Sequence, residues 1–213
     1  MTRPEVQEDL FGVVYPEGMA VLRGFALDVA DALVAEIGAL SAEAPFRHMV
    51  TPGGQSMSAA MTNCGLGWVT DRGGYRYSAH DPVSGKAWPR VPAVFMELAE
   101  RAAAAAGFPG FVPEGCLVNR YEPGARLALH QDLDEGDLTA PIVSVSLGLP
   151  AVFQFGGLKR SGPVMKIDLV HGDVVAWGGP SRLAFHGVMP LKPGVHPVTG
   201  GMRYNLTFRK ARL

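Results

Sequence analysis

The sequence predicts a mainly β protein in which helices come first and a double-sheet β-sandwich or barrel follows. Three observations lead to this prediction. The 213 residues fit a single domain. Apolar residues recur with a helical period in the first half of the chain and with a period of two after residue 111. Gly-Gly and Pro-Gly turn signals recur about every ten residues in the second half, which is typical of many short antiparallel strands.

The first predicted helix begins at Asp28, a residue type that caps helix N-termini. The apolar residues after it are spaced by four, four and three positions, as on a helix packed along one side. These residues are Val29, Leu33, Ile37 and Leu40.

The second predicted helix covers residues 91–107, with Pro92 in its first turn and Gly107 as its stop. Its apolar face consists of Phe95, Leu98 and Ala102. Residues 45–90, between the two helices, are rich in Gly, Pro, Ser and Asn and contain several aromatic residues. We expect loops and short hairpins there.

Three segments in the second half alternate between apolar and polar residues, as strands with two different faces do. They are residues 141–147, 164–169 and 202–209. The last alternates most cleanly, with Met202, Tyr204, Leu206 and Phe208 on one face and polar residues on the other.

Composition and charge exclude several classes of protein. Hydrophobic residues are 47% and charged residues 18% of the chain, which excludes a disordered or coiled-coil protein. The formal net charge of -1 argues against a protein held on nucleic acid mainly by its overall field. The charge is nevertheless uneven, at -4 for residues 1–110 and +3 for residues 111–213. No stretch reaches the roughly 18 apolar residues of a membrane-spanning helix.

The cysteines and the N-terminus predict a cytoplasmic location. Cys64 and Cys116 have neither CxxC spacing nor a zinc-site pattern, so we expect neither a disulfide scaffold nor structural zinc. Residues 1–12 are acidic and lack an apolar run after a basic start, so no signal peptide is expected.

Two histidines and an aspartate are candidate metal ligands. His130 and Asp132 are two residues apart, so on a strand or its end both point to one face. His186 supplies a third donor. Two His and one carboxylate form the facial triad of non-haem Fe(II) oxygenases. The HxD pattern is weak by itself, and the alternative is a solvated loop histidine beside an acidic run.

The strand predicted at residues 202–209 carries two arginines on its polar face. Arg203 and Arg209 share that face with Asn205 and Thr207, and a guanidinium can pair a carboxylate through two hydrogen bonds. At about 3.3 Å per residue the arginines lie near 20 Å apart, so they cannot share one carboxylate. We expect one to bind the far carboxylate of a ligand and the other to lean toward the metal. The alternative is the exposed polar face of an ordinary sheet.

Asn119 and Tyr121 share one face of a further strand and can donate hydrogen bonds. The Pro123-Gly124 turn that follows brings this pair alongside the candidate metal ligands. Either residue alone is unremarkable on a strand, and only the order of the three clusters makes the pattern specific.

Four blocks, in order, resemble the AlkB family of Fe(II)- and 2-oxoglutarate-dependent dioxygenases, specifically its bacterial alkylation-repair branch. The blocks are NRYEPGARLALHQDLDE, PIVSVSLGLPAVFQFGGLKR, HGDVVAWGGPSRLAFHGV and RYNLTFRK, and with AMTNCGLGW before them the resemblance covers nearly the whole chain. It implies a double-stranded β-helix (jelly roll) with a nucleotide-recognition lid. The implied single domain divides into an N-terminal helical extension (1–44), the lid (45–90) and a helix plus jelly-roll catalytic core (91–213).

The resemblance also implies the ligand sets. His130, Asp132 and His186 match the family's iron ligands and, with Arg209, form the catalytic set. The residues that match contacts of the cosubstrate 2-oxoglutarate are Asn119, Tyr121, Arg203, Asn205 and Arg209, with Leu127 and Ser144 as pocket walls. Iron(II), 2-oxoglutarate and O2 are the implied cofactors.

The implied reaction is oxidative demethylation of 1-methyladenine and 3-methylcytosine, releasing formaldehyde, succinate and CO2. The target base must be flipped out or single-stranded, so the implied partner is alkylated single-stranded DNA, with duplex DNA and RNA left open and a monomer expected. The implied substrate contacts are Met61, Trp68, Tyr75, Arg76, Tyr77, Asp134 and Arg160. For Trp68 and Met61 the alternative is a core position. We interpret His171 as structural, and Glu135 and Asp137 as solvated loop residues.

Two other functions remain open on the sequence alone. One is a 2-oxoglutarate oxygenase that acts on a protein or a small molecule, because the triad and the arginine pair would look the same. The other is a jelly-roll binding module whose histidines and arginines are structural.

Overall fold

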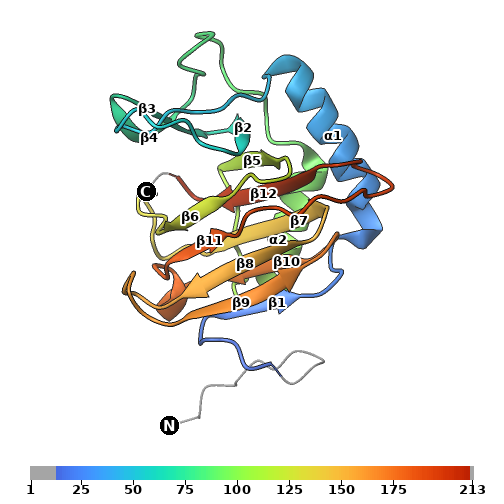
Figure 1. Cartoon of the computed structure of the whole chain (residues 1–213), viewed down its shortest axis with the longest axis vertical. Coiled ribbons are helices and arrows are strands. Elements are labelled where there is room, and N and C mark those ends of the chain that lie inside the picture. Colours follow the sequence, from blue (N-terminus) through green and yellow to red (C-terminus); the bar gives the residue numbers. More distant parts are fainter. Residues whose placement is uncertain (1–12, 212–213) are drawn as a thin grey trace.

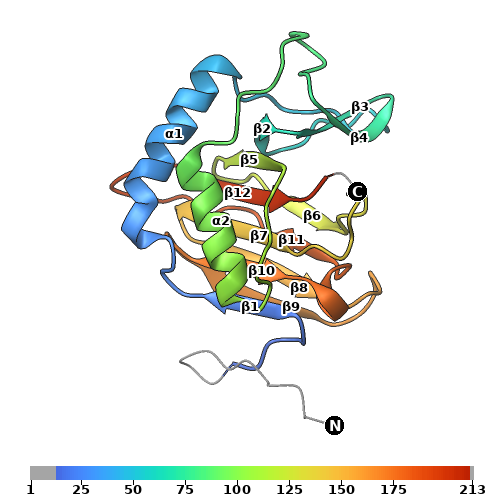
Figure 2. The ribbon, with the colours of Figure 1, turned by 180° about the vertical axis from the view of Figure 1, so that it is seen from behind.

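A computed structural model describes residues 13–211 of the chain. Two antiparallel sheets face each other, and two helices cover the outer side of the larger sheet (Figures 1 and 2). The prediction of a mainly β fold is confirmed, and the architecture is a jelly roll. The predicted absence of a signal peptide concerns residues 1–12 and lies outside the described residues.

The larger sheet has six strands and the smaller has four. In spatial order the six are β1 (Met19–Leu22), β10 (Val174–Trp177), β7 (Ile142–Gly148), β12 (Arg203–Arg209), β5 (Gly115–Tyr121) and β2 (Ala60–Gly65). The four are β6 (Leu127–His130), β11 (His186–Val188), β8 (Ala151–Gly156) and β9 (Val164–Leu169). A separate hairpin of β3 (Gly67–Asp71) and β4 (Gly74–Ser78), here called the lid hairpin, lies beyond β2.

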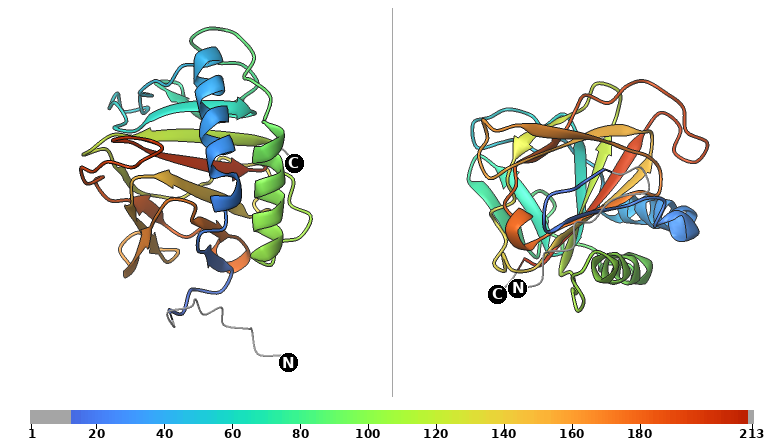
Figure 3. Two further views of the ribbon diagram at one scale, coloured as in Figure 1. Left: turned by 90° about the vertical axis from the view of Figure 1, so that its right-hand side faces the viewer. Right: turned by 90° about the horizontal axis from the view of Figure 1, so that it is seen from below.

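The two helices form where the periodicity predicts them. Helix α1 (Ala30–Glu43) buries Leu33, Ile37 and Leu40, and helix α2 (Ala93–Ala105) buries the predicted face of Phe95, Leu98 and Ala102. Gly107 ends α2 with a φ of 88°, which favours glycine. Figure 3 shows the helices lying side by side across the strands.

The predicted cap at Asp28 is wrong. Residues Leu27–Val29 form a short 3-10 helix, Val29 occupies the N-cap position of α1, and no side chain caps that end. The Asp28 carboxylate instead accepts hydrogen bonds of 2.7 and 2.9 Å from Arg101 of α2. Pro92 likewise stands at the N-cap of α2, one position before the first turn.

The strands of the larger sheet are buried on both faces, because helices cover one side and the smaller sheet the other. In β12, Leu206 and Phe208 pack outward against the helices, while the polar residues face the space between the sheets. The inner apolar cluster includes Tyr121, Phe153 and Trp177. Polar side chains on that inner face are therefore isolated from solvent and need partners.

Two strands of the larger sheet lie where the sequence predicted other structure. β1 belongs to the segment expected as a helical extension, and β2 to the segment expected as lid. β1 is only four residues long, too short to show a period. β2 reads Ala-Met-Thr-Asn-Cys-Gly and is buried on both faces, so its residues do not alternate. Within residues 13–211 no helix is long and apolar enough to cross a membrane.

Candidate active site

The three candidate metal ligands meet at the open end of the smaller sheet. His130 ends β6 and His186 begins β11, and the two are direct cross-strand partners. Asp132 follows β6, with its carboxylate oxygens 3.5 Å from His130 Nε2 and 3.6 Å from His186 Nε2. All three donor atoms lie within 4.8 Å of one another. The predicted grouping of the two histidines and the aspartate is therefore present.

Backbone carbonyls orient both imidazoles toward Asp132. His130 Nδ1 lies 2.9 Å from the Ala128 carbonyl and His186 Nδ1 lies 3.0 Å from the Ala184 carbonyl. Because a carbonyl only accepts, each Nδ1 carries the proton and each Nε2 presents a lone pair. Histidine ligands of metal ions are commonly fixed in this way.

The protonation states also suit a metal ion. Burial, with the nearby His130, lowers the pKa of His186 to about 3, so its imidazole is neutral at pH 7. Burial alone would raise the pKa of Asp132, but the charge of Arg209 lowers it well below its usual value. Asp132 Oδ2 is buried and forms no well-aligned hydrogen bond, but it lies 2.8 Å from Arg209 Nη2. The neutral His186 imidazole, the His130 imidazole and the ionised Asp132 carboxylate fit the donor set of a non-haem Fe(II) site.

The polar face of β12 points into the space between the sheets. Its residues are only 1–6% exposed: Arg203, Asn205, Thr207 and Arg209. The alternative of an ordinary solvent-exposed face is therefore wrong.

The two arginines have opposite surroundings. Arg209 Nη2 lies 2.8 Å from Asp132 Oδ2, and Arg209 Nε lies 3.4 Å from Glu135 Oε1. Arg203 has no ion pair among the described residues. Its Nη2 donates to Ser146 Oγ at 3.0 Å, and its guanidinium lies 5.0 Å from the Tyr121 ring. Among residues 13–211, no well-aligned hydrogen bond is made by its buried Nε and Nη1.

The remaining predicted cosubstrate residues line the same interior. In the register of β12 and β5, Arg203 faces Tyr121 and Asn205 faces Asn119. Asn205 Nδ2 donates to Ser144 Oγ at 2.8 Å. Asn119 is 2% exposed, and its Oδ1 has no hydrogen-bond partner in the part of the chain that the structure describes. The half-buried Leu127 packs against the inner cluster.

The lid hairpin contributes a stacked aromatic pair. The rings of Trp68 and Tyr75 lie 5.6 Å apart at 21°. Trp68 Nε1 donates to Asp134 Oδ2 at 2.8 Å. Trp68 is half-buried and Tyr75 is 49% exposed, so neither is a core residue. The structure thus brings together Trp68, Tyr75 and Asp134, two residues beyond the candidate ligand Asp132.

Sequence reasoning missed Glu135 and Arg182. Glu135 was expected to be a solvated loop residue, but it is 6% exposed. It accepts hydrogen bonds from the Tyr77 hydroxyl at 2.6 Å and from Arg182 Nη2 at 3.1 Å. Nothing in the run Asp-Leu-Asp-Glu distinguishes a buried acid from an exposed one. The partners of Glu135 are remote in sequence: Tyr77, Arg182 and Arg209.

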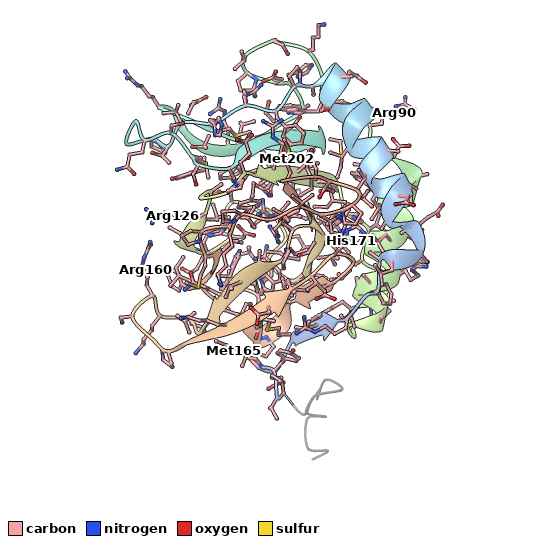
Figure 4. All side chains as sticks on the ribbon, turned by 45° about the vertical axis from the view of Figure 1, so that its right-hand side comes forward. Arg90, Arg126, Arg160, Met165, His171 and Met202 are labelled. Carbon is pink, nitrogen blue, oxygen red and sulfur yellow. The ribbon has the colours of Figure 1, made fainter. Side chains whose placement is uncertain are left out.

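The other predicted substrate residues make contacts outside the group of Trp68, Tyr75 and Asp134. Arg76 is exposed and pairs with Asp71 through two hydrogen bonds of 3.0 and 2.7 Å. Met61 is 1% exposed and packs in the inner cluster, so its core alternative describes its position. The exposed Arg160 lies 5.9 Å from the Phe185 ring and projects from the edge of the molecule in Figure 4. The partly exposed Asp137 accepts from Thr139, and His171 accepts from the Gly148 amide at 3.0 Å.

Comparison with known proteins gives relatives that match most of the chain. The family model described as "2OG-Fe(II) oxygenase superfamily" matches residues 18–209. The alpha-ketoglutarate-dependent dioxygenases AlkB of Salmonella typhimurium and of Escherichia coli are each 60% identical over 195 residues, covering 91% of this chain and 90% of theirs. The solved structure of OsALKBH1 is similar with a TM-score of 0.82 and 31% identity, covering 92% of this chain and 98% of that one.

Two more distant relatives have names that state a substrate. The DNA N(6)-methyladenine demethylase ALKBH1C of Arabidopsis thaliana is 34% identical over 63% of this chain and 35% of its own length. The tRNA demethylase abh1 of Schizosaccharomyces pombe is 34% identical over 68% of this chain and 47% of its own length. The family model, the 60% identity across nine tenths of both chains and the His-Asp-His cluster agree: this chain belongs to the bacterial branch of the AlkB family of 2-oxoglutarate- and Fe(II)-dependent dioxygenases.

Proposed function

We propose that this dioxygenase removes methyl groups from N-methylated bases of nucleic acid, with 1-methyladenine and 3-methylcytosine in single-stranded DNA as its main substrates. The observation that most supports the proposal is the group of Trp68, Tyr75 and Asp134 beside the candidate ligand Asp132. An aromatic face for stacking and a carboxylate for a cationic ring are what a methylated, flipped-out base requires. Relatives named as DNA and tRNA demethylases support the substrate class.

In this proposal His130, Asp132 and His186 hold the iron. Bound Fe(II) supplies the O2-dependent oxidation that converts 2-oxoglutarate to succinate and CO2 while the methyl group leaves as formaldehyde. The backbone carbonyls on both Nδ1 atoms keep the imidazoles oriented without further movement. The protein therefore supplies a preorganised set of donors.

Arg203 binds the distal carboxylate of 2-oxoglutarate in this proposal. A buried guanidinium with two unpartnered N–H groups and no anionic neighbour is unstable without an anion. Tyr121 and Asn119 form hydrogen bonds to 2-oxoglutarate at the same end. Asn205 holds Ser144 in the wall of the cosubstrate pocket. Arg209 lies at the metal end of the site, where it orients Asp132 and the carboxylate of 2-oxoglutarate that is nearer the metal.

The target base stacks on Trp68, and Asp134 faces its cationic ring. Because Trp68 Nε1 occupies only Asp134 Oδ2, the other carboxylate oxygen is left for the base. The exposed Tyr75 and Arg160 contact the phosphates of neighbouring nucleotides, as does Arg76 if its pair with Asp71 opens. Few cations take part, so binding should neutralise fewer than about eight phosphates and depend only moderately on salt.

Duplex DNA and RNA are further substrates within this proposal, the enzyme acts as a monomer, and it works in the cytoplasm. The last point is supported by Cys64 and Cys116. They face each other on paired strands β2 and β5, yet both are free thiols. Adjacent unoxidised cysteines are typical of a reducing compartment.

Turnover on methylated oligonucleotides tests the proposal. The protein is incubated with Fe(II), 2-oxoglutarate and ascorbate, and formaldehyde and unmethylated base are measured across single-stranded DNA, duplex DNA and RNA at one salt concentration. Asp132→Ala should abolish turnover and stoichiometric iron binding, whereas the matched control Asp137→Ala should alter neither. Decarboxylation of 2-oxoglutarate without demethylation of any oligonucleotide would instead indicate a protein or small-molecule substrate.

A further inference from the structure

Glu135 joins the lid hairpin to the arginines around the candidate metal ligands. Its side chain is 1% exposed. Oε1 accepts a hydrogen bond from the Tyr77 hydroxyl at 2.6 Å and lies 3.4 Å from Arg209 Nε. Oε2 accepts a hydrogen bond from Arg182 Nη2 at 3.1 Å. Groups from β4, from β12 and from the segment before β11 thus meet on one buried carboxylate.

Both of these arginines also hold Asp132. Arg209 Nη2 lies 2.8 Å from the Asp132 carboxylate. Arg182 Nη1 donates to the Asp132 backbone carbonyl at 2.9 Å, and its Nε donates to the Ala140 carbonyl at 2.9 Å. The position of a candidate iron ligand therefore depends on Glu135 through two guanidinium groups.

The segment after Asp132 holds the lid hairpin at two points. Trp68 and Tyr77 are direct cross-strand partners in β3 and β4. Asp134 accepts from Trp68 Nε1 and Glu135 accepts from the Tyr77 hydroxyl. Two consecutive carboxylates thus bind the two members of one cross-strand pair. The Tyr77 contact is the more buried of the two, and a buried charged hydrogen bond is the stronger kind.

We propose that Glu135 is a positioning residue that couples docking of the lid hairpin to the metal and cosubstrate end of the site. Tyr77 and Arg209 share Glu135 Oε1. When the lid hairpin undocks, Glu135 Oε1 loses the hydrogen bond from the Tyr77 hydroxyl. Arg209 then moves toward Glu135 and away from Asp132. By linkage, a ligand that holds Arg209 near Asp132 favours the docked hairpin by the same factor. Tyr77 is thereby a lid contact rather than a substrate contact.

This inference deepens the proposed function and rests on it only for the lid's role in holding a base. Its test needs no nucleic acid. Amide hydrogen exchange of residues 67–78 and the affinity for 2-oxoglutarate are measured on the full chain, with and without Mn(II) as a stand-in for Fe(II). In the wild type, Mn(II) with 2-oxoglutarate should slow exchange of the hairpin.

Tyr77→Phe removes one hydrogen bond to a charged acceptor, so hairpin exchange should become roughly tenfold faster. The same variant should bind 2-oxoglutarate at least about fivefold more weakly, and the ligand should no longer protect the hairpin. Glu135→Gln should give both effects, and the double variant should add little to either single one, because both act on one contact. The matched control is Tyr204→Phe, whose hydroxyl donates to Met202 Sδ on the outer side of β12.

Unchanged hairpin exchange in Tyr77→Phe would overturn the proposal. Faster exchange with 2-oxoglutarate affinity within twofold of the wild type would also overturn it, because the hairpin would then be held but not coupled. If Glu135→Gln fails to fold, Tyr77→Phe decides the matter alone, since it leaves every charge in place. Absent demethylation with these effects present would count against the proposed substrate and leave the coupling intact.

Discussion

The two ends of β12 place the same residue type in opposite electrostatic surroundings. Arg203 and Arg209 are both buried on one face of one strand. Arg209 has two carboxylates within 3.4 Å, Asp132 and Glu135, and Asp132 leads the charges that raise its pKa against the opposing effect of burial. Arg203 has an aromatic ring and a hydroxyl, and burial lowers its pKa. An arginine already neutralised within the protein orients its neighbours, whereas one left without a counter-charge requires an anionic ligand.

Arg203→Met should have the largest effect, and only on ligand binding. Losing a bidentate, charge-assisted pair costs about 4 kcal/mol, so 2-oxoglutarate should bind roughly a thousandfold more weakly. Without ligand the variant should be as stable as the wild type or more stable, because an unpaired buried charge has been replaced by an apolar side chain. Calorimetric titration and urea denaturation measure the two effects. A clear loss of stability would show that Arg203 is already neutralised.

Arg209→Met should have the reverse effect. It leaves Asp132 and Glu135 buried without their shared cation, so we expect the metal-free protein to lose about 3 kcal/mol of stability. A divalent metal on Asp132 replaces part of the lost positive charge, so the loss should shrink when Mn(II) is present. Urea denaturation with and without Mn(II) measures this difference. Equal losses under both conditions would mean that Asp132 does not bind the metal.

Sequence reasoning identified Arg203 and Arg209 at the two ends of β12, but not the difference between their electrostatic surroundings. The period of β12 identified its polar face and the HxD spacing identified His130 and Asp132, because nearby positions in the chain determine both, while His186 comes from the separate strand β11. Sequence reasoning expected Asn119 and Tyr121 beside the metal ligands, whereas strand pairing places them opposite Asn205 and Arg203.

The partners of Glu135 could not be predicted, since they come from chain positions 77, 182 and 209. Burial of β2 on both faces likewise removed the alternation by which strands are recognised. Local periodicity therefore predicted the elements and their faces, while ion pairs between distant segments required the fold itself.

Ser146→Ala should have a smaller effect on the Arg203 end of β12 than Arg203→Met. Ser146 Oγ accepts a hydrogen bond of 3.0 Å from Arg203 Nη2. Its loss should cost about 1 kcal/mol, and 2-oxoglutarate affinity should fall roughly fivefold. Thr207→Val, which removes a hydrogen bond to Asn205 Oδ1 nearer the middle of the strand, is the matched control. Similar affinities for both variants would show that the serine does not orient Arg203.

The smallest expected effect is a pH dependence confined to the Arg203 end. Gly148, the cross-strand partner of Arg203, donates its amide proton to His171 Nδ1 at 3.0 Å. Burial, with the nearby His196, lowers the pKa of His171 below its ordinary value.

A depressed histidine pKa means that the folded state favours the neutral ring, so the contribution to stability is complete above about pH 6.5 and is lost as the pH falls. Protonated Nδ1 can no longer accept from Gly148, and the β7 end beside Arg203 loosens. The affinity for 2-oxoglutarate should therefore weaken by less than about threefold between pH 7 and pH 5.5, since His171 is partly exposed to solvent. His171→Gln keeps an acceptor that does not titrate and should flatten this profile. Arg209 has no such partner, because its carboxylate neighbour Asp132 stays ionised well below its usual pKa. A profile unchanged by His171→Gln would place the acid sensitivity at the Arg209 end instead.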